Sequence, residues 1–257
     1  MMMSRSLRNR CLLPTLELLE GRDCPSVSAT FAFQTLLVRG DAADNEITIT
    51  DDGQGNVSAT IDGTTVEGKN VRNIIVLAGD GDDAVTYTAS GSLEASRRLG
   101  IHLGKGDDSF TLEGSQGITS GTLAVAVLGH QGADTMEVTL GSIDAGARAL
   151  LTLHGANGDD TATTTFTGDL NGKLAFGLHG GTGNDTLTGD VTVNEGSTGK
   201  LAALVQGGSG GDTLTLNIND SSAIDGETGL DFFRALVVGG SGNNTVDSTD
   251  NVTVVNR

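Results

Sequence analysis

The sequence predicts an all-β protein: a right-handed parallel β-solenoid of about seven coils with an N-terminal β cap. Three observations favour this fold class. A glycine-rich turn motif recurs about every 25 residues, alternating apolar segments flank its copies, and the 257 residues include 39 glycines, two prolines and no tryptophan. Such a period is typical of stacked repeats, in which each repeat buries its apolar face against its neighbours.

The turn motif occurs seven times and reads GDGDD, GKGDD, HQGAD, ANGDD, GTGND, GSGGD and GSGNN along the chain. The copies end at Asp83, Asp108, Asp134, Asp160, Asp185, Asp212 and Asn244. Successive end positions are 25, 26, 26, 25, 27 and 32 residues apart, so one coil holds about 25 residues.

Apolar and polar residues alternate around each turn, which is typical of half-buried strands. Residues two apart on a strand share a face, so Ile74 and Val76 before the first turn and Val85 after it are expected to point inward. The first row continues through Leu99, Val125, Leu151, Phe176, Ala203 and Ala235; the second through Ile101, Val127, Leu153, Leu178, Val205 and Val237; the third through Phe110, Met136, Ala162, Leu187, Leu214 and Val246. Stacking would make each row a continuous ladder inside a tube.

A less regular apolar position recurs later in each coil and predicts a third short strand. Its residues are Leu93, Ile118, Ile143, Leu170, Val193, Ile224 and Val252. We therefore expect three strands and three turns per coil.

The chain divides into three parts. Residues 28–70 contain alternating runs separated by DDGQGN and DG, which predict antiparallel hairpins that cap the open end of the solenoid. Residues 71–257 are the solenoid repeats, and residues 1–27 are a targeting or flexible segment.

Charge restricts the partners. The formal net charge is -18, which argues against nucleic acid and favours cations. No run of 18 apolar residues occurs, so no membrane span is expected. The only cysteines, Cys11 and Cys24, precede the repeats, so no disulfide framework holds the fold together.

Two copies of the turn, GGTGNDTLT and GGSGGDTLT, resemble the GGxGxDxUx nonapeptide of RTX, or haemolysin-type, calcium-binding repeats. The resemblance implies that stacked turns chelate Ca²⁺ through the sixth motif position, which falls on Asp83, Asp108, Asp134, Asp160, Asp185 and Asp212, with glycine carbonyls completing the shell. RTX coils have two such turns, whereas this chain has one per coil, so a single calcium ladder along one edge is expected.

Further oxygens lie beside these positions, on Asp82, Asp107, Asp159 and Asn184. Calcium takes six to eight oxygen ligands, so both sets are candidate metal ligands. The alternative is that Asp and Asn only adopt turn geometry and bond their own backbone, without a metal.

The segment LPTLELLEGRDCPS resembles a short LExLExR tag that opens many predicted exported bacterial repeat proteins. Together these features predict a non-catalytic, calcium-stabilised structural or adhesive protein, secreted or at the cell surface, whose expected partners are calcium ions and cell-surface or matrix components. The alternative is a carbohydrate-active β-helix enzyme. Its acids would lie on the long connection near Asp220, Asp225, Glu227 and Asp231, where no partner groups or aromatic platforms are evident.

Two other patterns have plain explanations. His102, His154 and His179 share an outward position before their turns, which predicts a solvated ladder more than a transition-metal site. Six cations open the first strand of six coils and predict a charge-balancing stripe more than a polyanion site. They are Arg72, Arg97, Arg148, Lys173, Lys200 and Arg234.

Overall fold

The computed structural model describes residues 27–220, 232–249 and 253–255. The predicted tag, both cysteines, Ile224, Val252 and the acids Asp225, Glu227 and Asp231 lie outside these residues. Within them the protein is all-β, and no helix is long and apolar enough to cross a membrane.

Two ten-stranded sheets, called sheet A and sheet B here, form the molecule. Sheet A contains β1 (Ser28–Ala32), β2 (Thr35–Arg39), β6 (Asn73–Asp80), β8 (Arg97–Lys105), β10 (Thr122–Gln131), β12 (Arg148–Asn157), β14 (Lys173–Thr182), β16 (Lys200–Ser209), β18 (Phe232–Ser241) and β20 (Thr253–Val255). Sheet B contains β3 (Glu46–Asp51), β4 (Val57–Ile61), β5 (Thr64–Gly68), β7 (Ala84–Ala89), β9 (Ser109–Gly114), β11 (Thr135–Leu140), β13 (Thr161–Gly168), β15 (Thr186–Val193), β17 (Thr213–Asp220) and β19 (Thr245–Ser248).

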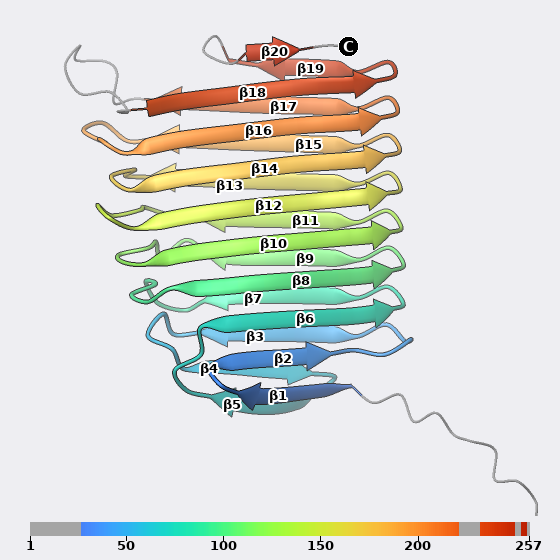
Figure 1. The fold of residues 1–257 in the computed structure, drawn as a ribbon, viewed down its shortest axis with the longest axis vertical. Helices are drawn as coiled ribbons and strands as arrows, with labels where there is room; N and C mark the ends of the chain where they lie inside the picture. Colours follow the sequence, from blue (N-terminus) through green and yellow to red (C-terminus); the bar gives the residue numbers. More distant parts are fainter. Residues whose placement is uncertain (1–26, 221–231, 250–252, 256–257) are drawn as a thin grey trace, which may run out of the picture.

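Each coil contributes one strand to each sheet and crosses between them at the predicted turn. Like strands of successive coils pair in parallel, as β10 does with both β8 and β12. In Figure 1 the nearer strands run to the right, the more distant ones run to the left, and the chain climbs, so the coil is right-handed. The predicted parallel solenoid is confirmed.

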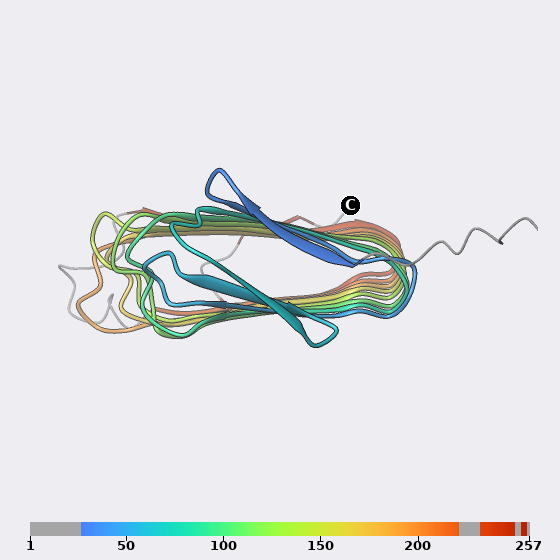
Figure 2. The same cartoon turned by 90° about the horizontal axis from the view of Figure 1, so that it is seen from below.

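The prediction of a third strand per coil is wrong. Leu93, Ile118, Ile143 and Leu170 make only isolated parallel bridges to one another. Their side chains are nevertheless buried, at 0–2% exposed. These residues lie on the connections from sheet B back to sheet A, at the left of Figure 2. The connections differ in length and path from coil to coil, so one apolar residue stays in register while its neighbours do not form a ladder.

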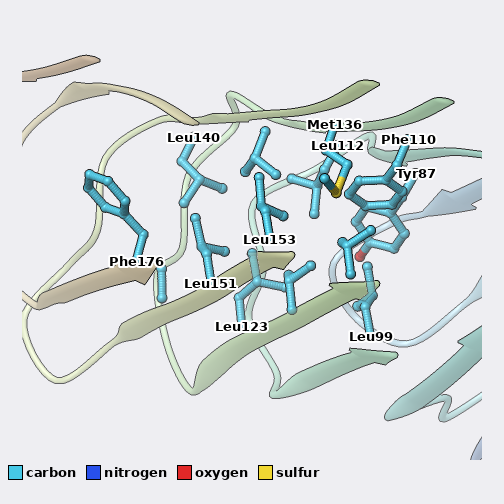
Figure 3. Packing of buried hydrophobic residues seen from close by; sticks show 14 of the residues in the cluster. Tyr87, Leu99, Phe110, Leu112, Leu123, Met136, Leu140, Leu151, Leu153 and Phe176 are labelled. Carbon is cyan, nitrogen blue, oxygen red and sulfur yellow. The ribbon is translucent and has the colours of Figure 1, made fainter. Parts of the chain in front are cut away.

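The core is a stack of the predicted rows between the two sheets (Figure 3). Leu99 pairs with Val125, and Val125 pairs with Leu151, so the first row is in register across neighbouring coils. The second row is buried at 0–1% exposed, and the third is buried except at Val246, which is partly buried. All three predicted inward rows are confirmed.

Antiparallel hairpins begin the described chain. β1 pairs with β2, and β4 pairs with both β3 and β5. Phe33 and Gln34 between β1 and β2 have φ of 48° and 64°, as two-residue hairpin turns require. Figure 2 shows the β4–β5 hairpin crossing the end of the tube. β2 and β3 also pair in parallel with β6 and β7, so the hairpins continue into the solenoid.

Arg97 corrects the predicted cationic stripe, because it is only 2% exposed. Its guanidinium donates to both carboxylate oxygens of Asp51, which also accepts from the Tyr87 hydroxyl at 2.8 Å. The cause is strand parity: Arg97 lies two residues before the inward Leu99, whereas Arg148 lies three residues before the inward Leu151. A fully hydrogen-bonded ion pair thus joins β3, β7 and β8 inside the tube.

Candidate metal centre on the stacked turns

The seven turns stack along one edge of the solenoid, on the right of Figure 1. Glycine is required there by the approach of neighbouring coils. Gly183 has φ +131°, and a Cβ on it would lie 1.9 Å from the carbonyl oxygen of Gly158 in the previous coil. The glycine signature therefore has a structural cause that does not involve a metal.

The aspartates that end the turns form an inner row pointing into the loops. Asp83, Asp108, Asp134, Asp160, Asp185 and Asp212 are each 1–2% exposed. In each coil Oδ1 accepts a hydrogen bond from the backbone N–H of the matching residue in the preceding coil, at 2.7–3.1 Å. One side-chain oxygen per coil thus satisfies a buried backbone donor and links two coils.

The other oxygen of every inner aspartate, Oδ2, is buried and has no hydrogen-bond partner. In four coils, those of Asp134, Asp160, Asp185 and Asp212, it lies against the backbone of the glycine five residues earlier. A Cβ on Gly155 would be 2.1 Å from Oδ2 of Asp160, and one on Gly180 would be 2.1 Å from Oδ2 of Asp185. The chain therefore leaves six buried, unpartnered carboxylate oxygens stacked along one edge.

Burial makes the ionised form of these carboxyls costly. Desolvation, with added repulsion from neighbouring aspartates, raises the pKa of Asp83 and of Asp134 to about 6 and that of Asp160 to about 7. Burial also raises the pKa values of Asp108 and Asp185, although the backbone hydrogen bond that each carboxylate accepts lowers them. Near neutral pH the inner row needs protons or a cation to offset its charge.

Asp82, Asp107, Asp159 and Asn184 form an outer row, which is exposed. Here Oδ1 accepts from the backbone N–H of the following coil, as between Asp82 and the amide of Asp107 at 2.8 Å. Each outer-row Oδ1 thus accepts from the following coil, whereas each inner-row Oδ1 accepts from the preceding coil. The two ladders run in opposite directions and tie each turn to both neighbours.

At its two ends the inner row is continued by asparagine. Asn45 donates its backbone N–H to Asp83 at 2.8 Å, and Asn244 accepts from the backbone N–H of Asp212 at 2.9 Å. The side-chain Nδ2 of Asn244 donates to the carbonyl of Gly240 at 3.4 Å. An amide therefore fills the same place as a carboxylate without adding charge.

The donor set fits calcium in part. The unpartnered Oδ2 atoms are hard anionic oxygens, which suit this ion. The described residues include no group of three or more acidic, histidine or cysteine side chains that could hold a metal. One oxygen of each inner aspartate is already engaged, so a bound ion would need backbone oxygens or water for the rest of its six to eight ligands.

The histidines form two pairs beside this edge. His102 Nδ1 lies 3.1 Å from His130 Nε2, and the rings of His154 and His179 have centroids 5.9 Å apart. The sequence pattern missed His130 because it lies near the end of β10, two residues beyond the shared position. Burial first, and then the neighbouring histidine, lower the pKa values of His102 and His179. No third metal-binding side chain joins either pair among the described residues.

Of the predicted cationic stripe, Arg148, Lys173 and Lys200 remain in direct register on β12, β14 and β16. All three are exposed at the beginning of their strands, at the end opposite the turns. These three cations and the inner aspartates therefore occupy opposite edges of the solenoid.

The chain matches no protein-family model, and neither the curated proteins nor the solved structures gave a match.

Proposed function

We propose that this chain is a non-catalytic, exported structural repeat protein whose acidic turn edge binds calcium and is stabilised by it. The observation that carries the proposal is the row of six buried Oδ2 atoms without hydrogen-bond partners. A buried carboxylate oxygen in this state is costly, and repetition along a stack adds repulsion between like charges. A divalent cation removes both costs.

The likeness of the turns to RTX repeats supports calcium over other cations. So does ligand chemistry, because calcium tolerates irregular oxygen shells, whereas Mg²⁺ demands octahedral geometry and gives up its water reluctantly. Export is supported by the resemblance of LPTLELLEGRDCPS to the LExLExR tag. A weak calcium site is compatible with this location, because extracellular calcium-binding modules commonly bind the ion weakly.

The test begins with protein freed of metal by a chelator. Calcium titrated into it should release or absorb heat in calorimetry and raise the melting temperature. A ligand at about 100 times its Kd adds roughly 2.7 kcal/mol of folding stability per independent site. Magnesium should produce a much smaller shift.

Asp185 and Asp212 end the two turns that combine a complete glycine set with a terminal aspartate, and they should contribute to the strongest site. The double change Asp185→Asn and Asp212→Asn should lower the calcium stoichiometry and reduce the thermal shift. The matched control is Asp144→Asn with Asp169→Asn, which removes the same charge at two exposed positions outside the turns. Equal losses in both variants would indicate a general charge effect and contradict the proposed site.

If wild-type protein shows neither heat nor a melting shift with calcium, the turns are hydrogen-bonded corners and the calcium proposal is wrong. Cleavage of polyuronates by the purified chain would contradict the non-catalytic assignment.

A further inference from the structure

The two sheets present chemically different outer faces. On sheet B the outward row Thr86, Thr111, Glu137, Thr163, Thr188 and Thr215 is entirely polar. On sheet A the row in the middle of the strands is mostly apolar: Ile75, Gly100, Ala126, Thr152, Gly177, Leu204 and Leu236. The polar outer face of sheet B is suited to contact with water. The apolar outer face of sheet A is not, and the proposed calcium binding at the turns gives no reason for it.

Exposed large hydrophobic side chains also occur on this face of sheet A. The large hydrophobic residues that remain exposed among the described residues are Phe33, Ile75, Leu150 and Val254. Ile75 and Leu150 lie on the outer face of sheet A strands and carry the argument. Phe33 is in the turn between β1 and β2, and Val254 is in register with the inward Val237. In Figure 1 no described element lies over the face of sheet A that is turned to the viewer.

A hollow of ≈ 450 Å³ lies on this face. Its lining includes Leu150, Leu204 and Leu236 together with the small residues Ala175, Gly177 and Ala202. Leu150 is 45% exposed and lies directly opposite Ala175 on the next strand. A protruding leucine thus adjoins a hollow floored by small residues.

This arrangement is self-complementary. A two-fold axis parallel to the strands, between β12 and β14, would place Leu150 of each copy over Ala175 and Gly177 of the other. Isologous contacts of this kind are the commonest in homo-oligomers. With strands ~4.8 Å apart from β6 to β18, the face measures about 30 by 20 Å, so two copies would bury roughly 1,200 Å², the lower limit of stable interfaces.

We propose that the outer face of sheet A is the surface through which two copies of this chain associate. The contact is driven by apolar burial, since the middle row has no charged residue. Arg148, Lys173 and Lys200 lie at the rim, and the exposed Arg98 lies on β8 in the row of Ala124 and Leu150. Each copy carries a formal net charge of -18, so long-range repulsion opposes association. Salt should therefore strengthen the dimer, because it screens repulsion and leaves apolar contacts intact.

The test is sedimentation equilibrium of the full chain over about 1 to 100 µM, a range in which contacts of this size commonly dissociate. The expected result is a reversible monomer–dimer equilibrium that shifts toward dimer as sodium chloride rises. The double change Leu150→Lys and Leu204→Lys should weaken association at least tenfold. The matched control, Thr163→Lys with Thr188→Lys, introduces the same charge on the outer face of sheet B and should leave association unchanged.

Both variants should retain the wild-type far-UV spectrum, because all four substituted side chains point outward. A wild-type chain that stays monomeric over the whole concentration range overturns the proposal. So does a dimer that survives the leucine changes, since such a dimer forms elsewhere, for example at the C-terminal end of the stack. Neither result depends on whether the turns bind calcium.

Discussion

The inner row predicts an unusual response to amide substitution at Asp160. Asp160→Asn keeps Oδ1 as acceptor for the backbone N–H of Asp134, which is at 2.9 Å, but removes the charge of the unpartnered Oδ2. The end residue Asn244 already fills this place in the last coil. In calcium-free protein at pH 8, the asparagine variant should therefore be more stable than wild type.

The magnitude follows from the spacing. Asp160 has a charged neighbour one coil away on each side, Asp134 and Asp185. Unit charges at the inter-strand distance of ~4.8 Å repel by about 1 kcal/mol in a water-like dielectric. Removing two such repulsions should stabilise the fold by about 1–2 kcal/mol, which raises the melting temperature by roughly 2–8 °C in a domain of this size.

Asp160→Ala is the matched comparison, because it removes the same charge but also the hydrogen-bond acceptor. It leaves the buried N–H of Asp134 unsatisfied, at a cost of about 1–3 kcal/mol relative to the asparagine variant. Thermal unfolding of the three proteins in chelator, followed by circular dichroism, measures both differences. If the asparagine variant melts below wild type, the inner carboxylates do not repel one another as the structure implies.

Two further predictions follow from the turns. The raised pKa values of Asp83, Asp134 and Asp160 mean that the folded state binds more protons than the unfolded state between about pH 4 and pH 7. Metal-free protein should therefore lose stability as pH rises through this range, with a shallower slope in Asp160→Asn; equal slopes in thermal melts would contradict the assignment. Ala156 has φ +88° at a position where five of the other six coils place glycine, so Ala156→Gly should raise stability by about 1 kcal/mol in a denaturant titration. A destabilised glycine variant would show that this φ is not strained.

The repeat and the inward rows were predictable from sequence because both depend on local periodicity. Coil length follows from the spacing of the glycine turns, and the side-chain period of two assigns Leu99, Val125 and Leu151 to one face before any contact is known. Arg97 shows the limit of this reasoning. Its place near a strand start groups it with the other cations, although a shift of one residue reverses the face on which a side chain lies.

The sequence by itself determined the fold class, the coil length, the three inward rows and the position of the acidic turns. Only the tertiary structure decided how the turn carboxylates are used. Whether Oδ1 bonds to a coil above or below, and whether Oδ2 finds a partner, depends on atoms about 25 residues away in the chain. The difference between the two outer faces also required the strand register, since a hydrophobic residue on one strand becomes part of a surface only when neighbouring coils align with it. Pattern is local, whereas hydrogen-bond partners and surfaces are created by stacking.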